Sequence, residues 1–366
     1  MLTKLDKVPF PFFGGKSQAA PLVWSLLGDT DHYVEPFMGS LAVLLNRPHP
    51  CNRAYYSETV NDADGFVCNA WRSMQMHPEE TAHAGSWPVC EADKQARQIR
   101  LLEWKRDHDL EHLMGDPLWC DPVMAGWWIW AVSVQIGAFA GNGPWIADPA
   151  TGRIMKQPRG PRRGREPGVT RDLPHLAGDG QGINRPQARE PGVYTDEDES
   201  NEFHPITMPE ITRWFRYLSA RLRHVRILNG DWKRVCTTGA MWTLPVRMGD
   251  GHVGVFLDPP YANGERTTGL YAHDDGDVAA ECLAWCVKNG DHPRTRIVLA
   301  GYDTEHAELT RHGWTVHEWF TAGFLRGGMA QQGQDGHQQG RERLWASPHC
   351  LTPGTTQPDA QLSIFG

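Results

Sequence analysis

Apolar positions in residues 1–72 alternate between the period of an amphipathic helix and the short continuous runs of a buried strand. Strands that alternate with helices favour a parallel sheet, because a parallel pair needs a long crossover connection that a helix usually fills. The predicted order is a helix near 17–27, a strand at 31–36, a helix near 40–46, a strand near 53–58 and a helix from about 64.

The same alternation returns in residues 204–347, and the tail at 348–366 is expected to be loose. The two α/β stretches therefore predict one domain that is divided in the sequence. Its second part is predicted to contain a helix at about 207–223, the strand before NGDW in VRILNGDW, the strand before DPPY in VGVFLDPPY, a helix near 277–289, the strand RIVLAGY, and two final strand candidates, TVHEWF and RERLWASP.

Residues 73–150 have a different character. Apolar positions recur at helical spacing around Ile99–Leu113 and Val123–Ile136, and tryptophans are concentrated between Trp87 and Trp145. Large aromatic side chains at helical spacing are more often core residues than ligand-binding ones. We therefore predict a compact helical insert whose tryptophans pack its interior.

Residues 151–203 are rich in glycine, proline and charge, a composition that cannot bury enough apolar surface to fold alone. We expect a flexible loop. An acidic run, Asp196–Glu199, follows a basic one, so the loop is interpreted either as an arm that DNA orders along its phosphates or as a solvated linker. The basic residues are Arg153, Lys156, Arg159, Arg162, Arg163, Arg165 and Arg171.

The bulk composition limits the class of protein without identifying it. At 366 residues the chain can form a full α/β core and a second, smaller domain. A net charge of −8 does not indicate a nucleic-acid partner, although phosphate contacts need only one basic face. The eight cysteines are scattered, and no stretch approaches the roughly 20 apolar residues of a membrane span. We expect a cytoplasmic protein with reduced thiols.

The strongest chemical signal is Asp258-Pro259-Pro260-Tyr261, directly after the apolar run Val253–Leu257. A buried strand that ends in an acid places the carboxylate at the carboxyl edge of a parallel sheet, where such folds bind ligands. The Asp258 carboxylate and the Pro259 carbonyl can accept both hydrogens of an exocyclic amine, and Tyr261 can stack on its ring. The alternative is an ordinary proline turn that closes a strand.

A second signal is the sequence Tyr33–Ser40, in which a strand turns into a helix through Gly39, so that backbone amides can face a polar ligand. Glu58 lies nineteen residues after Gly39, near the end of the next predicted strand, and Asp62 follows it. An acid about 20 residues after a glycine turn suits the two hydroxyl groups of a ribose. A helix start without a ligand is an equally good interpretation of this segment taken alone.

Two weaker motifs complete the set. The segment Phe12–Lys16 pairs two glycines, which let the backbone approach a ligand closely, with the positive charge of Lys16. The segment Asn229–Trp232 places Asp231 and an aromatic ring after an apolar strand. Each motif has little weight alone.

In the order GGK, EPFMGS, VNDADGFVCNAWR, NGDW, DPPY and RERLWASP, the motifs resemble Dam-type (D12 class) DNA adenine-N6 methyltransferases, with bacteriophage members the most similar. The resemblance covers roughly residues 9–72 and 204–347. It implies a Rossmann-like α/β sheet that binds S-adenosylmethionine, with an inserted, mainly helical target-recognition domain. It also implies double-stranded DNA as the partner and, for a phage protein, the cytoplasm of the bacterial host.

The resemblance also assigns residues by position. It places along the cofactor Phe12, Gly15, Lys16, Glu35, Phe37 and Gly39. Asp62 aligns best with the family's ribose-binding acid, while Glu58 fits the spacing rule better, and both are kept. The residues near the cofactor's adenine would be Asp231 and Trp232. The catalytic loop would be Asp258, Pro259, Pro260 and Tyr261, with Asp258 also at the cofactor. The DNA-binding arginines would be Arg159, Arg162, Arg163 and Arg165.

The sequence departs from the family at two places. Leu41 stands where the glycine turn usually has a second glycine, a difference expected to reshape the methionine pocket. The insert between Trp71 and Phe203 is longer than the usual recognition region, so sequence specificity does not carry over.

Three alternatives to adenine methylation remain. One is cytosine-N4 methylation, which is less favoured because the family's enzymes for that reaction usually have Ser at the position of Asp258. Another is a DNA-binding homologue without turnover. The third is a metal site at Cys282 and Cys286, which are more typical of core residues, so no metal is expected.

Overall fold

The computed structural model describes residues 8–10, 12, 15–48, 57–87, 91–107, 110–134, 145–147, 154–156, 207–242, 251–260, 278–303, 305–319 and 342–353. A seven-stranded sheet with the order β5-β2-β1-β6-β7-β9-β8 organises them. Its strands are β1 (His32–Glu35), β2 (Ser57–Asp62), β5 (Val225–Asn229), β6 (Val253–Leu257), β7 (Thr295–Tyr302), β8 (Thr315–Glu318) and β9 (Glu342–Ala346).

The sheet is parallel from β5 to β7, and β9 lies antiparallel between β7 and β8. The strand order reverses between β1 and β6, since the chain leaves β1 toward β2 and returns on the other side with β6. Such a reversal separates the loops after the two strands and opens a crevice at their carboxyl ends. The prediction of an α/β protein with a mainly parallel sheet is confirmed.

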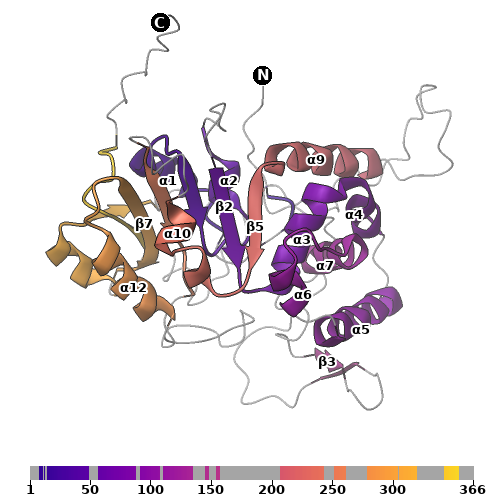
Figure 1. Cartoon of the computed structure of the whole chain (residues 1–366). Coiled ribbons are helices and arrows are strands. Elements are labelled where there is room, and N and C mark those ends of the chain that lie inside the picture. The colour runs from indigo at the N-terminus through magenta and orange to yellow at the C-terminus, as the bar shows by residue number, and fades with distance from the viewer. Residues whose placement is uncertain are drawn as a thin grey trace, which may run out of the picture.

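Helices cover both faces of the sheet (Figure 1). Alternate strand residues face opposite sides, so Tyr33 and Phe256 belong to one apolar cluster, while Val34 and Leu257 belong to another. The first cluster includes residues of α1 (Ala20–Leu27), α2 (Ala42–Leu45), α3 (Gly65–Met76), α7 (Pro122–Val134) and α9 (Thr207–Leu222). The second includes residues of η1 (Trp232–Arg234), α10 (Thr238–Met241), α12 (Val278–Asn289) and η2 (Ala307–His312).

Helices also occupy most of the described part of residues 73–150, beside β5 (Figure 1). They are α4 (Pro78–Gly85), α5 (Glu91–Asp107), α6 (Leu110–Gly115) and α7, and a short antiparallel pair follows, β3 (Trp145–Ala147) with β4 (Ile154–Lys156). The pair was not predicted. The apolar residues of the helices α4 to α7 share one continuous core with the sheet, because α3 and α9 pack against α4 and α7.

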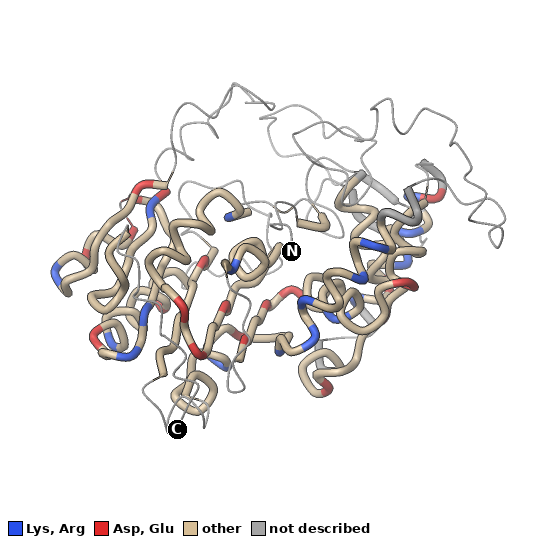
Figure 2. The backbone as a smooth tube through the Cα atoms, turned by 90° about the horizontal axis from the view of Figure 1, so that it is seen from above, with Lys and Arg blue, Asp and Glu red and all other residues tan. Residues whose placement is uncertain are grey.

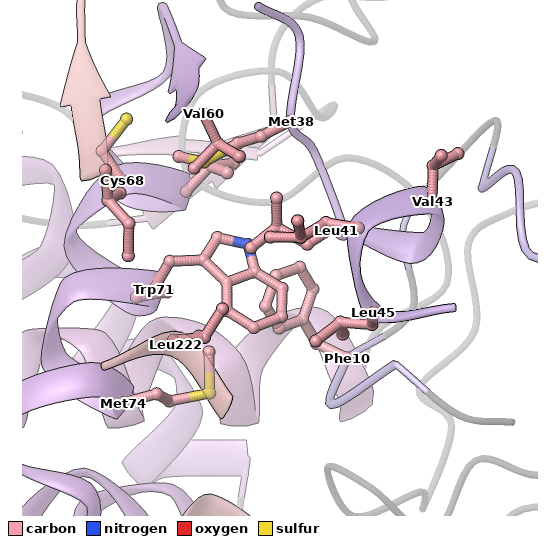
Figure 3. Packing of buried hydrophobic residues seen from close by; sticks show 14 of the residues in the cluster. Phe10, Met38, Leu41, Val43, Leu45, Val60, Cys68, Trp71, Met74 and Leu222 are labelled. Carbon is pink, nitrogen blue, oxygen red and sulfur yellow. The ribbon is translucent and has the colours of Figure 1, made fainter. Parts of the chain in front are cut away.

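Trp71 of α3 lies at the centre of this shared core, as Figure 3 shows. Phe10 packs with ring centroids 5.5 Å from Trp71 and 5.0 Å from Trp128 of α7. Next to Trp71, the buried Arg72 donates to the carbonyl oxygens of Ile227, at 2.9 Å, and Asp116, at 2.9 Å. The loop before α7 is thereby tied to β5 by an arginine that has almost no exposed surface.

At the opposite, amino edge of the sheet, His32 is buried in a neutral state. Its Nδ1 lies 2.6 Å from the Met241 carbonyl oxygen, which requires the proton to be on Nδ1, and its Nε2 then accepts from the Thr59 hydroxyl at 3.0 Å. Burial lowers the pKa of His32 from 6.5 to about 4. A second histidine, His306, is likewise buried, and its pKa is also lowered to about 4.

We predict that these histidines make the fold sensitive to acid. Between pH 6.5 and about pH 4 the unfolded chain binds a proton at His32 that the folded chain does not, so the free energy of unfolding falls as the pH falls. The loss from His32 alone is at most about 3 kcal/mol. Urea unfolding across this range should give a flatter pH dependence for His32→Gln than for wild type. The exposed control His224→Gln should leave the dependence unchanged, and an equally steep curve for His32→Gln would contradict the assignment.

Candidate active site

The carboxyl ends of the parallel strands bring separate sequence motifs to one edge of the sheet. Because β9 runs antiparallel, its first residue, Glu342, lies at this same edge, opposite Tyr302 at the end of β7. Acidic positions run through the middle of the molecule in Figure 2, where the strands lie. The predicted site residues at or just after these strand ends are Glu35, Phe37, Gly39, Asp62, Asp231, Trp232, Asp258, Pro259 and Pro260.

The turn after β1 is held from three sides at Gly39, whose φ is +41°. Its amide donates to the Asp62 Oδ2 atom at 3.0 Å, and its carbonyl accepts from the Trp71 indole N–H at 2.8 Å. The Phe12 ring covers the third side, since a Cβ atom at Gly39 would lie 2.6 Å from the Phe12 Cε1 atom. The N-terminal segment at Phe12 therefore packs over the glycine turn. The motifs had predicted that these two segments would lie in one site.

We predict that Gly39→Ala destabilises the fold by about 1–3 kcal/mol, because the new methyl group meets Phe12 and the backbone has a positive φ. Removing the ring in a Phe12→Ala/Gly39→Ala double variant should recover the part of the loss that comes from the collision. A double-mutant cycle by urea unfolding measures this coupling. Strictly additive losses would show that the ring does not limit the residue at position 39.

Leu41 has the left-handed backbone conformation, with φ 53° and ψ 25°, that a second glycine would adopt without strain. This conformation costs a non-glycine residue roughly 1–2 kcal/mol, whereas full burial of a leucine side chain contributes about 1.5–3 kcal/mol. The Leu41 side chain is fully buried, and Figure 3 shows it among the core residues near Trp71. The turn therefore keeps the geometry of a glycine, and the leucine stabilises the core beneath it.

The choice between the two candidate ribose acids depends on where β2 begins. The strand was predicted near 53–58 and is observed at Ser57–Asp62, so the expectation that Glu58 lies near its end is wrong. Glu58 is the second residue of β2, at the amino edge, where Arg221 holds both carboxylate oxygens at 2.7 and 2.8 Å. Arg47 lies 3.5 Å from the same carboxylate. Glu58 thus belongs to a buried ion-pair network far along the strand from Asp62.

Asp62 ends β2 at the carboxyl edge. Its Oδ1 atom accepts from the Asp64 amide at 2.9 Å and its Oδ2 atom from the Gly39 amide. Burial raises the pKa of Asp62 to about 7, and these backbone hydrogen bonds lower it in part. Each carboxylate oxygen can accept more than one hydrogen bond, so the group keeps capacity for two hydroxyl donors.

Lys16 and Asp258 form an ion pair across the site. The Lys16 Nζ atom lies 3.0 Å from the Asp258 Oδ2 atom and 3.8 Å from the Glu342 Oε2 atom. The lysine side chain is only 4% exposed, whereas that of Asp258 is 20% exposed. Burial lowers the pKa of Lys16, but the two carboxylates outweigh it and raise the pKa above its ordinary value. The Lys16 ammonium group therefore contacts Asp258 from the buried side.

The remaining predicted residues differ in their exposure to solvent. Glu35 is buried and accepts from the Tyr33 hydroxyl at 3.0 Å, and burial raises its pKa well above the ordinary value. Trp232 is 5% exposed and is a core residue, its ring 5.9 Å from that of Phe37. Phe37 is half-buried and Asp231 is exposed, so these two face outward after β1 and β5.

Several predictions lie outside the described residues. They include Tyr261 and the four arginines of the predicted DNA-binding arm, Arg159, Arg162, Arg163 and Arg165. Cys282 and Cys286 are described, and they are buried on α12, with pKa values raised by burial, which disfavours the thiolates that a metal needs. Within the described ranges, no group of three His, Cys, Asp or Glu side chains could hold a metal ion. None of the helices that the structure describes is long and apolar enough to cross a membrane.

Sequence reasoning missed three residues of the site. Glu342, in the predicted final strand, shares Lys16 with Asp258, and Trp71 holds the carbonyl of the glycine turn. Asn61 binds two loops at the same edge. Glu342 lies within RERLWASP, and Asn61 and Trp71 lie within VNDADGFVCNAWR, so the resemblance of these motifs to the family was the one available signal.

The sheet is parallel over most of its strands and has a strand-order reversal, with a glycine turn after β1 and a carboxylate after β6. This arrangement is typical of Rossmann-like folds, which bind polar ligands at such an edge. Residues 12–89 match the family of D12 class N6 adenine-specific DNA methyltransferases, which confirms the resemblance for that part of the chain. The match spans the glycine turn, β2 and α3. Asp258, directly after β6, lies outside the matched residues, and the fold brings it to the same edge of the sheet. No curated protein matches the chain. The family match implies DNA adenine methylation and supports a methyltransferase.

Proposed function

We propose that the protein transfers a methyl group from S-adenosylmethionine to the N6 amine of an adenine that is flipped out of double-stranded DNA. The observation that carries the proposal is the position of Asp258, which Lys16 holds at the carboxyl edge of the sheet, across the strand-order reversal from the glycine turn. A carboxylate fixed beside a ligand-binding turn can orient an amine for attack without further reorganisation.

The residues at this edge suit a ligand that carries positive charge and a ribose. The carboxylates of Asp62, Asp231 and Asp258 come from the ends of three strands, and the nearby cation Lys16 is already paired with Asp258. Asp62 keeps acceptor capacity for a pair of hydroxyl groups, and Phe37 offers a half-buried ring. When bound, S-adenosylmethionine would supply an ammonium group, a ribose and an electrophilic methyl group on a sulfonium.

The loop after β6 supplies acceptors for the target amine. The Asp258 carboxylate and the Pro259 carbonyl would accept its two hydrogens and turn its lone pair toward the methyl group, while Pro260 adds no competing N–H. Tyr261 would stack on the extruded adenine in place of the lost base stacking. The new N–C bond forms as the S–C bond breaks, and the amine loses its extra proton afterwards, so a strong base is not required.

Basic residues would hold the DNA. We assign phosphate contacts to the arm at Arg159, Arg162, Arg163 and Arg165, because closely spaced arginines bind phosphates irrespective of base sequence. The helices from α4 to α7 would serve as the target-recognition part, and among them α5 carries the Lys and Arg residues. The shared core with α3 would keep those helices in a fixed relation to the site.

The test is methyl transfer from labelled S-adenosylmethionine to unmethylated DNA, with the product nucleoside identified and Asp258→Ala carried in parallel to exclude contaminating enzymes. N6-methyladenine from wild type alone would support the proposal. N4-methylcytosine would overturn the choice of base while keeping the amine chemistry. Tight DNA binding without any product would favour a non-catalytic homologue.

A further inference from the structure

Asn61 connects the two loops on either side of the strand that carries it. The residue is 1% exposed and is the penultimate residue of β2. Its side-chain amide nitrogen donates to the Pro36 carbonyl oxygen at 3.1 Å, in the loop after β1, and to the Gly230 carbonyl oxygen at 2.9 Å, in the loop after β5. The backbone carbonyl of Asn61 accepts from the Met38 amide at 2.9 Å, which adds a second tie to the loop after β1.

Chemistry fixes the orientation of this amide. Two carbonyl oxygens face one end of the side chain, and only the NH₂ end can donate to both. The opposite end, Oδ1, is buried and has no hydrogen-bond partner among the residues that the structure describes. The contribution of Asn61 therefore lies in its two donors, which a residue of another type at this position would not reproduce.

The two loops carry the groups assigned to the cofactor. Pro36 immediately precedes the half-buried ring of Phe37 and the glycine turn, and Gly230 immediately precedes Asp231. Between the loops, Asp62 follows Asn61 at the end of β2. Backbone contacts to Asp62 also hold each loop, since its Oδ2 atom accepts from the Gly39 amide and its carbonyl accepts from the Gly230 amide at 2.9 Å. Among these contacts, the Asn61 side chain is the group that bonds both loops directly.

We propose that Asn61 is a positioning residue that holds the loops after β1 and β5 at the spacing required by the nucleoside half of S-adenosylmethionine. This inference rests on the proposed function. Asn61 does not need to touch the cofactor, because a shift of the loops would misplace several contacts at once.

The chain offers a matched control at the other edge of the sheet. The Gln75 amide nitrogen also donates to two backbone carbonyls, those of Leu222 at the end of α9 and Val225 at the start of β5. Replacing either amide by the corresponding acid puts a carboxylate oxygen in the place of the NH₂ group. This oxygen cannot donate to the two carbonyl oxygens that it faces. Asn61→Asp and Gln75→Glu therefore make the same chemical change at the two ends of the sheet.

The test measures the dissociation constant of S-adenosylmethionine by calorimetry without DNA, together with the melting temperature of each variant. We expect Asn61→Asp to weaken binding by about tenfold or more and to raise the KM for S-adenosylmethionine far more than it lowers kcat. Gln75→Glu should lower the melting temperature and leave the affinity unchanged. Asn61→Ala, which deletes the donors without adding charge, gives the same test where the aspartate variant does not fold.

Three outcomes separate the inference from the proposed function. Wild-type affinity in a folded Asn61 variant would overturn the positioning role and leave the proposed function intact. An equal loss of affinity in Gln75→Glu would also overturn it, because the effect would then follow from general destabilisation. A wild-type protein that binds no S-adenosylmethionine would overturn the proposed function and the inference with it.

Discussion

The Asp258→Asn variant is expected to lose methyl transfer by about a thousandfold while it remains folded. Asparagine keeps the size of the side chain, but the Lys16 ammonium, 3.0 Å from Oδ2, would bind its oxygen. The NH₂ end would then face the target amine, so that a donor meets a donor where an acceptor is needed. Single-turnover transfer from labelled S-adenosylmethionine to DNA, with both reactants saturating, measures the loss in the chemical step.

A matched control is Asp291→Asn, the same change at a carboxylate that is 95% exposed. It should transfer methyl groups at the wild-type rate. A rate for Asp258→Asn within tenfold of wild type would mean that the carboxylate does not orient the amine.

The second large effect is expected from Lys16→Met, which should slow methyl transfer by about a hundredfold. Methionine fills the buried space of the lysine stem, so the change mainly removes the charge that holds Asp258 and lies near Glu342. Without the ammonium group, the two carboxylates repel each other and each becomes harder to ionise. The acidic limb of the pH–rate profile should therefore move to higher pH, because the proposed mechanism uses the Asp258 carboxylate in its charged form.

The exposed pair between Lys233 and Glu281, at 2.6 Å, provides the control. Lys233→Met removes the same charge from a pair that water already screens, and both the rate and the pH profile should stay close to wild type. A Lys16→Met enzyme that is slow but has an unshifted acidic limb would assign Lys16 to folding of the site instead of to the charge on Asp258.

The structure also shows why the helices after residue 76 cannot be treated as a separable unit. Trp71 and Arg72 are neighbours on α3, yet one binds the carbonyl of the glycine turn and the other binds the loop before α7. A displacement of α3 would therefore disturb both the proposed cofactor edge and the helices proposed to recognise DNA. Only the paired contacts of these two side chains reveal this connection.

The sequence by itself determined the types and order of most elements. The run Val253–Leu257 and residues 297–301 of β7 are apolar throughout because both faces of a parallel strand are covered, and that composition can be recognised locally. The same locality made the turn after β1 and the DPPY loop predictable, since glycine and proline act on the backbone at their own positions. The short pair β3–β4 lacks such a signal and was missed.

The tertiary structure decided which distant residues act together. The start of β2 at Ser57 moved Glu58 to the amino edge and left Asp62 at the carboxyl edge, a distinction that spacing along the chain could not make. Pairing of Lys16 with Asp258 depends on the strand order, which places β6 beside β1. Periodicity records which face of an element is buried, but which elements become neighbours is set by packing between residues far apart in the chain, and no local pattern carries that information.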